Sequence, residues 1–186
     1  PRRAVCLGGV SGWAAMWTRM SETSRVIATP GQAVDKRYAA WMGQALDLAS
    51  GALASGDVPV GALVLSSGGE VLGTGRNMRE AIGDPTSHAE VVAIRAAASA
   101  LGGWRLQGCT LFVTLEPFVM CAGALMLARI GRLVIGAWAP NAGACGSVWD
   151  LVVDRRAPQR DGVIGGGPGQ ECLQCLADFL GGSPHW

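Results

Sequence analysis

Short apolar runs typical of β-strands alternate with stretches of helical periodicity between residues 35 and 180, and this alternation constrains the fold most. The strands are predicted at residues 58–65, 70–74, 110–115, 132–137 and 162–164. The helices are predicted at residues 35–53, 87–101, 117–129 and 170–180, with Asp35 as the first N-cap. Ser66–Gly69 forms a hairpin turn between the first two strands. Strands that alternate with helices after an opening hairpin indicate an α/β sandwich with a mixed sheet.

Residues 1–34 differ in character from the rest of the chain. Two arginines precede an apolar stretch, as in an export signal, but glycines interrupt that stretch and no clear cleavage site follows. We therefore expect residues 1–34 to be a disordered leader, or the sequence to begin upstream of a true start at Met20. The folded domain is expected over residues 35–182, and residues 183–186 form a short tail.

The composition excludes several classes of protein. Charged residues make up 16% of the chain and hydrophobic residues 49%, which is typical of a compact globular domain. A formal net charge of +1 excludes a strongly basic nucleic-acid coat. Uncharged runs such as Pro117–Ala128 fall short of the ~20 apolar residues that a membrane span needs. Six scattered cysteines favour a reduced, cytoplasmic setting over a secreted disulfide scaffold.

Two short motifs carry residue types that bind metals. His88-Ala-Glu90 and the run from Pro117 to Cys121 each lie where a helix is predicted to begin. They match the H-x-E and P-C-x-x-C signature of zinc deaminases, except that Phe118 stands in place of the first cysteine. Two thiolates at positions i and i+3 share one helix face, and a histidine supplies a third ligand. The fourth position then stays open for water, which a glutamate beside the histidine can deprotonate.

Several further stretches resemble the bacterial tRNA-specific adenosine deaminases, at the spacing of that family and over residues 35–180. The matching stretches are Val58–Ala62, Asp84–Glu90, Thr114–Pro117, Cys121–Ala124, Arg129–Gly131 and Gly143–Ser147 with Asp150. The resemblance implies a three-layer α/β/α sandwich with a mixed sheet of about five strands, as in cytidine deaminases. It also implies a cytoplasmic homodimer that converts adenosine to inosine at the wobble position of a tRNA anticodon loop.

The same resemblance implies roles for individual residues. His88 and Cys121 become ligands of Zn²⁺, Glu90 the catalytic proton shuttle, and Asn77 a residue that binds the flipped nucleoside. The metal-bound hydroxide would attack C6 of adenine, and ammonia would leave. An anticodon loop suits this chemistry because its bases are already unpaired.

Phe118 is the main departure from the family pattern, because phenylalanine has no donor atom and a catalytic zinc needs three protein ligands. We expect this chain to bind zinc weakly and to turn over slowly or not at all. Cys109 lies too far along its strand to substitute, and Met120 points off the ligand face, whereas Cys145 lies in a loop whose path the sequence leaves open. Ala139 is a second departure, at a position where the family often has an acidic residue near the substrate.

Other readings of these residues stay open at this point. Ser87 and Glu90 fit a helix capping box, and Asn77 fits a turn at a strand end. Cys172 and Cys175 have the spacing of a metal pair but also that of small core residues on a helix. A basic cluster suits a solvated loop or a phosphate contact, and it comprises Arg155, Arg156 and Arg160.

Two alternative functions follow from the same motifs. Loss of the metal with retention of the fold predicts a pseudo-deaminase that serves as an RNA-binding subunit or a dimer partner. A guanine or cytosine deaminase is the enzymatic alternative. Thr114–Glu116 and the Gly143–Ser147 loop favour the tRNA substrate over these free bases.

Overall fold

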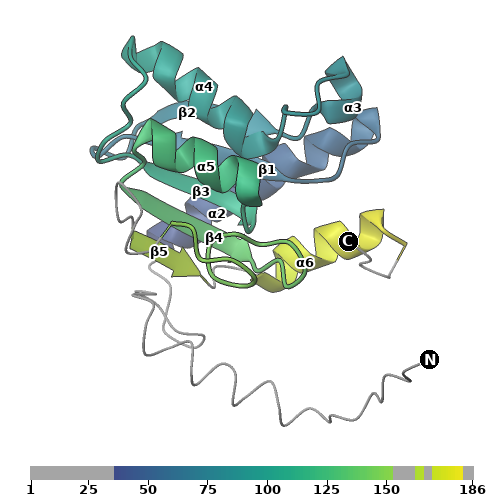
Figure 1. Cartoon of the computed structure of the whole chain (residues 1–186). Helices are drawn as coiled ribbons and strands as arrows, with labels where there is room; N and C mark the ends of the chain where they lie inside the picture. The colour runs from purple at the N-terminus through teal and green to yellow at the C-terminus, as the bar shows by residue number, and fades with distance from the viewer. Residues whose placement is uncertain (1–35, 153–161, 166–168, 182–186) are drawn as a thin grey trace, which may run out of the picture.

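The computed structural model describes residues 36–152, 162–165 and 169–181, and the tertiary arrangement of their elements is shown in Figure 1. The expected N-cap Asp35, the arginine cluster and the segments 1–34 and 183–186 lie outside these residues. The elements in chain order are α2 (Lys36–Ser50), η1 (Gly51–Ser55), β1 (Gly61–Leu65), β2 (Val71–Arg76), α3 (Arg79–Ile82), α4 (Ala89–Leu101), β3 (Thr110–Leu115), α5 (Val119–Ala128), β4 (Arg132–Ala137), β5 (Gly162–Gly165) and α6 (Gly169–Phe179).

The strands form one mixed sheet of five strands in the order β2-β1-β3-β4-β5. β1 pairs antiparallel with both β2 and β3, whereas β3, β4 and β5 run parallel. The hairpin turn closes through the Ser66 amide, which donates to the carbonyl oxygen of Glu70 at 2.8 Å. β3 and β4 are parallel because α5 carries the chain back along the sheet between them. The predicted α/β class and mixed sheet are confirmed.

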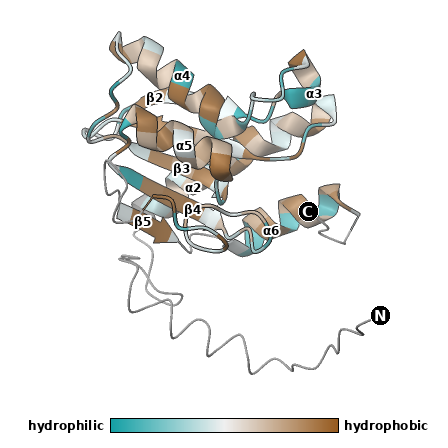
Figure 2. Cartoon of the chain, viewed as in Figure 1, coloured by the Kyte–Doolittle hydropathy of each residue, from teal (hydrophilic) through white to brown (hydrophobic). Residues whose placement is uncertain are grey.

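Helices cover both faces of the sheet (Figure 1). α4 and α5 lie on one face and contact each other, and α4 crosses β1 and β2. α2 and α6 lie on the other face, where Met42 and Cys172 both approach Gly136 of β4. The predicted three-layer arrangement is therefore confirmed. The central strands are buried along almost their whole length, and Figure 2 shows how strongly apolar residues dominate them.

The two helices that carry the motifs begin later than predicted. α4 begins at Ala89 and α5 at Val119, because the backbones of His88 and Phe118 are extended and occupy the N-cap positions. Pro117 was predicted inside the first turn, but it lies outside the helix. The cause is strand pairing beyond the end of β3, where the amide of Glu116 donates to the carbonyl of Ala137 at 2.8 Å.

The capping-box interpretation of Ser87 and Glu90 is wrong. His88 is the N-cap of α4, and no side-chain hydrogen bond caps this helix. The Ser87 hydroxyl instead donates to the carboxylate of Asp84 at 2.8 Å. Glu90 is therefore not part of a capping box with Ser87. Within the described residues, no helix is both long and apolar enough to span a membrane.

Gly75 in β2 allows the first turn of α4 to lie directly on the sheet. A Cβ at this position would lie 2.2 Å from the carbonyl oxygen of Ala89 and 2.6 Å from the amide nitrogen of Ala93. These are backbone atoms, so a side chain at Gly75 cannot be accommodated by a rotamer change.

We expect Gly75→Ala to lower the free energy of unfolding by about 1–3 kcal/mol because α4 must move away from β2. The matched control is Gly43→Ala in α2, where a Cβ meets no atom within 4 Å. Helix propensity predicts that this control gains about 0.5–1 kcal/mol. Urea unfolding of the two variants measures both effects, and equal midpoints for Gly75→Ala and the parent chain would contradict the prediction.

Candidate functional site

The N-terminal ends of α4 and α5 meet at one point and bring together three residues that the sequence analysis singled out. His88 precedes α4, Glu90 lies in its first turn, and Cys121 lies in the first turn of α5. The Nδ1 atom of His88 lies 3.6 Å from the Sγ atom of Cys121. One donor atom from each of the three residues lies within 4.8 Å of the other two. Both helix dipoles place positive potential at this point, which favours anionic ligands.

Burial controls the protonation of these three groups. It lowers the pKa of His88, with a smaller contribution from the Arg79 guanidinium, and so favours the neutral imidazole. Burial raises the pKa of Glu90 to about 7, although its own backbone N–H and the Cys121 thiol oppose the shift. The pKa of Cys121 is raised by burial and then by the neighbouring Glu90, so the free thiol stays protonated.

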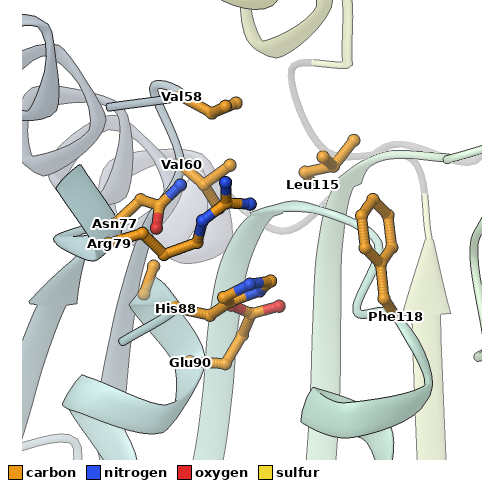
Figure 3. Close-up of a pocket in the computed structure, with 9 residues that line it drawn as sticks. Val58, Val60, Asn77, Arg79, His88, Glu90, Leu115 and Phe118 are labelled. Atoms are coloured by element: carbon orange, nitrogen blue, oxygen red, sulfur yellow. The ribbon is translucent and has the colours of Figure 1, made fainter. Parts of the chain in front are cut away.

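A small pocket lies above these groups, and Figure 3 shows its lining. Asn77 and Arg79 lie on one side and Phe118 on the other, with His88 and Glu90 between them. A volume of about 40 Å³ is open to water-sized molecules. This is room for about three waters at ~10–15 Å³ each, which is much smaller than a nucleobase. Phe118 is one of the side chains that bound this small space.

Asn77 directly follows β2 and is 5% exposed. The backbone N–H of Asn77 donates to the carbonyl oxygen of Val60 at 3.0 Å, and this hydrogen bond holds the residue beside β1. The side-chain oxygen Oδ1 is buried and has no hydrogen-bond partner. A buried polar atom without a partner is costly, so Oδ1 is available for a donor on a ligand.

The donors present do not fit the zinc site of the H-x-E and P-C-x-x-C signature. Phe118 occupies the position of the first cysteine and contributes only a ring to the pocket. Cys145 is buried with its thiol 3.8 Å from the carbonyl oxygen of Pro117. In the part of the chain that the structure describes, the group of three metal donors contains His88, Glu90 and Cys121 alone. The question that the sequence left open for Cys145 is thus answered: it is not in the cluster.

The remaining candidate residues do not line the pocket and lie elsewhere in the fold. Cys109 is buried immediately before β3, at the opposite end from Leu115 of the pocket. Cys172 is buried in the core on α6, and Cys175 is half-buried on the same helix. Their interpretation as core residues is confirmed for Cys172. Ala139 is 3% exposed, and its amide donates to a carboxylate oxygen of Glu116 at 2.9 Å.

Glu116 supports the site structurally, and the sequence analysis did not single it out for this role. Its buried carboxylate accepts hydrogen bonds from the amides of Ala139, Cys145 and Ser147 and from the hydroxyl of Ser147. It thereby fastens the loop after β4 to the end of β3, beside the start of α5. Gly143 completes this arrangement, because a Cβ there would lie 2.0 Å from the carboxylate. The sequence signal that could have identified Glu116 is the position of an acidic residue directly after an apolar strand.

Asp57 is a second residue that the sequence analysis missed. Its carboxylate accepts the amides of Glu80 and Ala81 at 2.8 and 3.1 Å and the hydroxyl of Ser55 at 2.7 Å. Burial opposes ionisation, but these hydrogen bonds outweigh it and lower the pKa of Asp57. This carboxylate holds α3, and with it Arg79, against the pocket.

Glu116→Gln is expected to lower the free energy of unfolding by about 2–3 kcal/mol, because the amide group cannot accept all of the bonds that the carboxylate accepts. Urea unfolding measures the loss, with Glu70→Gln as a control at an exposed glutamate in the hairpin turn. Identical midpoints for Glu116→Gln and the control would show that the loop does not depend on the carboxylate.

Glu90→Gln is expected to change the pH dependence of stability in metal-free protein. A carboxyl whose pKa rises from 4.5 to about 7 on folding binds more protons in the folded state. Its burial therefore destabilises the protein progressively as the pH rises through this range. Relative to the parent, Glu90→Gln should gain up to about 3 kcal/mol at pH 8 and little at pH 4.5. The measurement is urea unfolding of chelator-treated parent and variant at pH 8 and at pH 4.5. An equal gain in the free energy of unfolding at both pH values would contradict the prediction.

Comparison with known proteins places these features in a family. Residues 35–137 match the cytidine and deoxycytidylate deaminase zinc-binding region. The chain is 40% identical over 140 residues to the tRNA-specific adenosine deaminase of Bacillus subtilis, a match that covers 75% of this chain and 86% of that protein. It is also 48% identical over 151 residues to the tRNA(Ile)-lysidine synthase of Deinococcus radiodurans, but spans only 26% of that protein.

Solved structures agree with the sequence comparison. A structure from a study of A-to-I editing by tRNA:A34 deaminases superimposes with a TM-score of 0.71 at 37% identity, covering 74% of this chain and 99% of the other. The guanine deaminase from Nitrosomonas europaea, at 22% identity and a TM-score of 0.64, shares the fold over 96% of this chain and 97% of its own. The chain belongs to the cytidine and deoxycytidylate deaminase family.

Proposed function

We propose that this chain is a deaminase domain built to convert adenosine to inosine at the wobble position of tRNA. The observation that carries the proposal is the convergence of His88, Glu90 and Cys121 beneath a pocket that also contains the unpartnered Oδ1 of Asn77. The sequence identity of 40% to a tRNA-specific adenosine deaminase supports this substrate over a free base. The guanine deaminase of Bacillus subtilis superimposes with a TM-score of 0.52 at 28% identity, and this weaker similarity supports guanine less strongly as the substrate.

The residues of the pocket suit the two tasks of this reaction. Hydrolytic deamination adds water at C6 of adenine and releases ammonia, so one group must accept a proton and return it to the leaving amine. Glu90 suits this role because its pKa of about 7 allows both steps near neutral pH. Asn77 suits recognition of the base, because its buried Oδ1 can accept a hydrogen bond from it.

Phe118 limits the activity of this chain in two ways. It leaves the zinc site without a thiolate at this position, and its ring lines one side of a pocket that is much smaller than a nucleobase. We therefore expect slow turnover by the chain as it stands. The same substitution favours the second candidate, a pseudo-deaminase that retains the fold and serves as an RNA-binding subunit or dimer partner.

The proposed partners are a tRNA anticodon loop and a second copy of this chain. Exposed apolar side chains on α5 support the homodimer, since Val119, Met120 and Leu127 are 54, 38 and 76% exposed. The proposed deaminase domain covers residues 35–182. The proposed location is the cytoplasm, which a tRNA substrate supports.

Phe118→Cys is expected to strengthen zinc binding and to raise the rate of inosine formation by at least about 100-fold, because it supplies the missing thiolate. The rate is measured on an anticodon stem-loop RNA, and free guanine and cytosine are tested beside it. Phe118→Ala is the matched control, since it opens the pocket without adding a donor. If Phe118→Ala forms inosine as fast as Phe118→Cys, the slow turnover of the parent chain is due to the size of the pocket and not to the missing thiolate.

No inosine from zinc-loaded Phe118→Cys, in a chain that folds normally, would contradict the proposed substrate. Turnover of free guanine or cytosine by the same variant would replace it with the base-deaminase alternative. Rescue of a strain that lacks its own wobble deaminase by the parent chain would exclude the pseudo-deaminase.

A further inference from the structure

We propose that Glu90 itself completes the metal site of this chain, so that His88, Glu90 and Cys121 together bind one zinc ion. The carboxylate takes the ligand position that Phe118 leaves without a donor. This inference changes the role of Glu90 in the parent chain from a free proton carrier to a metal ligand. It concerns metal binding and does not depend on which base or RNA the pocket accepts.

The geometry of the donors fits a tetrahedral ion. With bonds of about 2.3 Å to sulfur and about 2.05 Å to nitrogen, a tetrahedral zinc holds the two donors about 3.6 Å apart. The observed separation of His88 Nδ1 and Cys121 Sγ is 3.6 Å. A carboxylate oxygen of Glu90 lies within 4.8 Å of both atoms. Small side-chain movements therefore bring all three donors to bonding distance.

Charge balance favours the carboxylate as the third ligand. A neutral histidine and one thiolate leave a divalent ion with a net charge of +1 in a buried site, which is costly. Ionised Glu90 brings the net charge to zero, as a second thiolate would. Glu90 is 4% exposed, and no ion pair involves it among the described residues.

The alternatives for the third ligand are weaker. Cys145 is not a member of the group of donors that lie within 4.8 Å of one another, and its thiol lies 3.8 Å from the carbonyl oxygen of Pro117. Replacing that contact would also disturb the loop that Glu116 holds through the Cys145 amide at 3.0 Å. Glu90 needs no backbone change, because it already shares the first turn of α4 with the His88 N-cap.

A consequence is that metal binding and turnover separate in this chain. A carboxylate bound to the ion is not available to carry protons, so the parent chain can retain zinc and remain slow. Phe118→Cys restores the thiolate and thereby releases Glu90. The role of Glu90 thus depends on the residue at position 118, and this dependence is measurable as a coupling between two substitutions.

The test is a double-mutant cycle in zinc affinity, measured by competition with a chromophoric chelator on the parent, Glu90→Gln, Phe118→Cys and the double variant. In the parent background, Glu90→Gln should weaken zinc binding by at least about 100-fold, because it removes one of three ligands. In the Phe118→Cys background, the same substitution should change the affinity by no more than about twofold. Circular dichroism of each metal-free variant checks that it is folded.

Cobalt(II) substitution supplies a second readout. The sulfur-to-cobalt charge-transfer band should have the intensity of one thiolate in the parent and of two in Phe118→Cys. Equal zinc affinity of the parent and Glu90→Gln would overturn the inference, and so would a parent chain that binds no zinc. Failure of Phe118→Cys to form inosine would count against the proposed function alone, because the coupling in zinc affinity is measured without RNA.

Discussion

The buried carboxylate of Glu116 fixes the place where β3 ends and α5 begins, and the geometry of the site depends on it. Its four hydrogen bonds draw the loop after β4 against the end of β3. The amide of Ala144 in that loop donates to the carbonyl of Pro117 at 2.9 Å, which holds the turn into α5. Cys121 consequently faces His88 from the first turn of the helix. A residue with no contact to the pocket thus determines where one of its donors lies.

The pocket combines a preserved scaffold with one altered ligand position. Helix ends, burial and hydrogen bonds place His88, Glu90 and Cys121 as a metal site requires, whereas Phe118 contributes no donor. Because charge must still be balanced in a buried site, the nearest carboxylate becomes the natural replacement. The two proposals are therefore linked by a single residue, since in both of them the residue at position 118 sets the proposed role of Glu90.

Local pattern predicted the central strands closely. β3 and β4 coincide with the predicted residues 110–115 and 132–137, because strands buried on both faces are continuous apolar runs bounded by polar or glycine residues. The starts of α4 and α5 were each predicted two residues early, since the extended backbones of His88 and Phe118 result from pairing and contacts that are distant in sequence. Helix periodicity carries no information about such contacts.

The amino-acid sequence by itself determined the alternation of strands and helices, the identity of His88, Glu90, Cys121 and Asn77 as candidates, and the absence of a thiol at Phe118. Hydrophobic periodicity sufficed for the alternation, whereas the candidate residues came from the match to the zinc-deaminase signature and from the resemblance to the tRNA-specific adenosine deaminases. Only the tertiary structure decided that Cys145 lies outside the donor group and that a carboxylate oxygen of Glu90 lies within 4.8 Å of the His88 and Cys121 donor atoms. Both results depend on how two helices and a loop meet at one edge of the sheet, and long-range packing alone sets those distances.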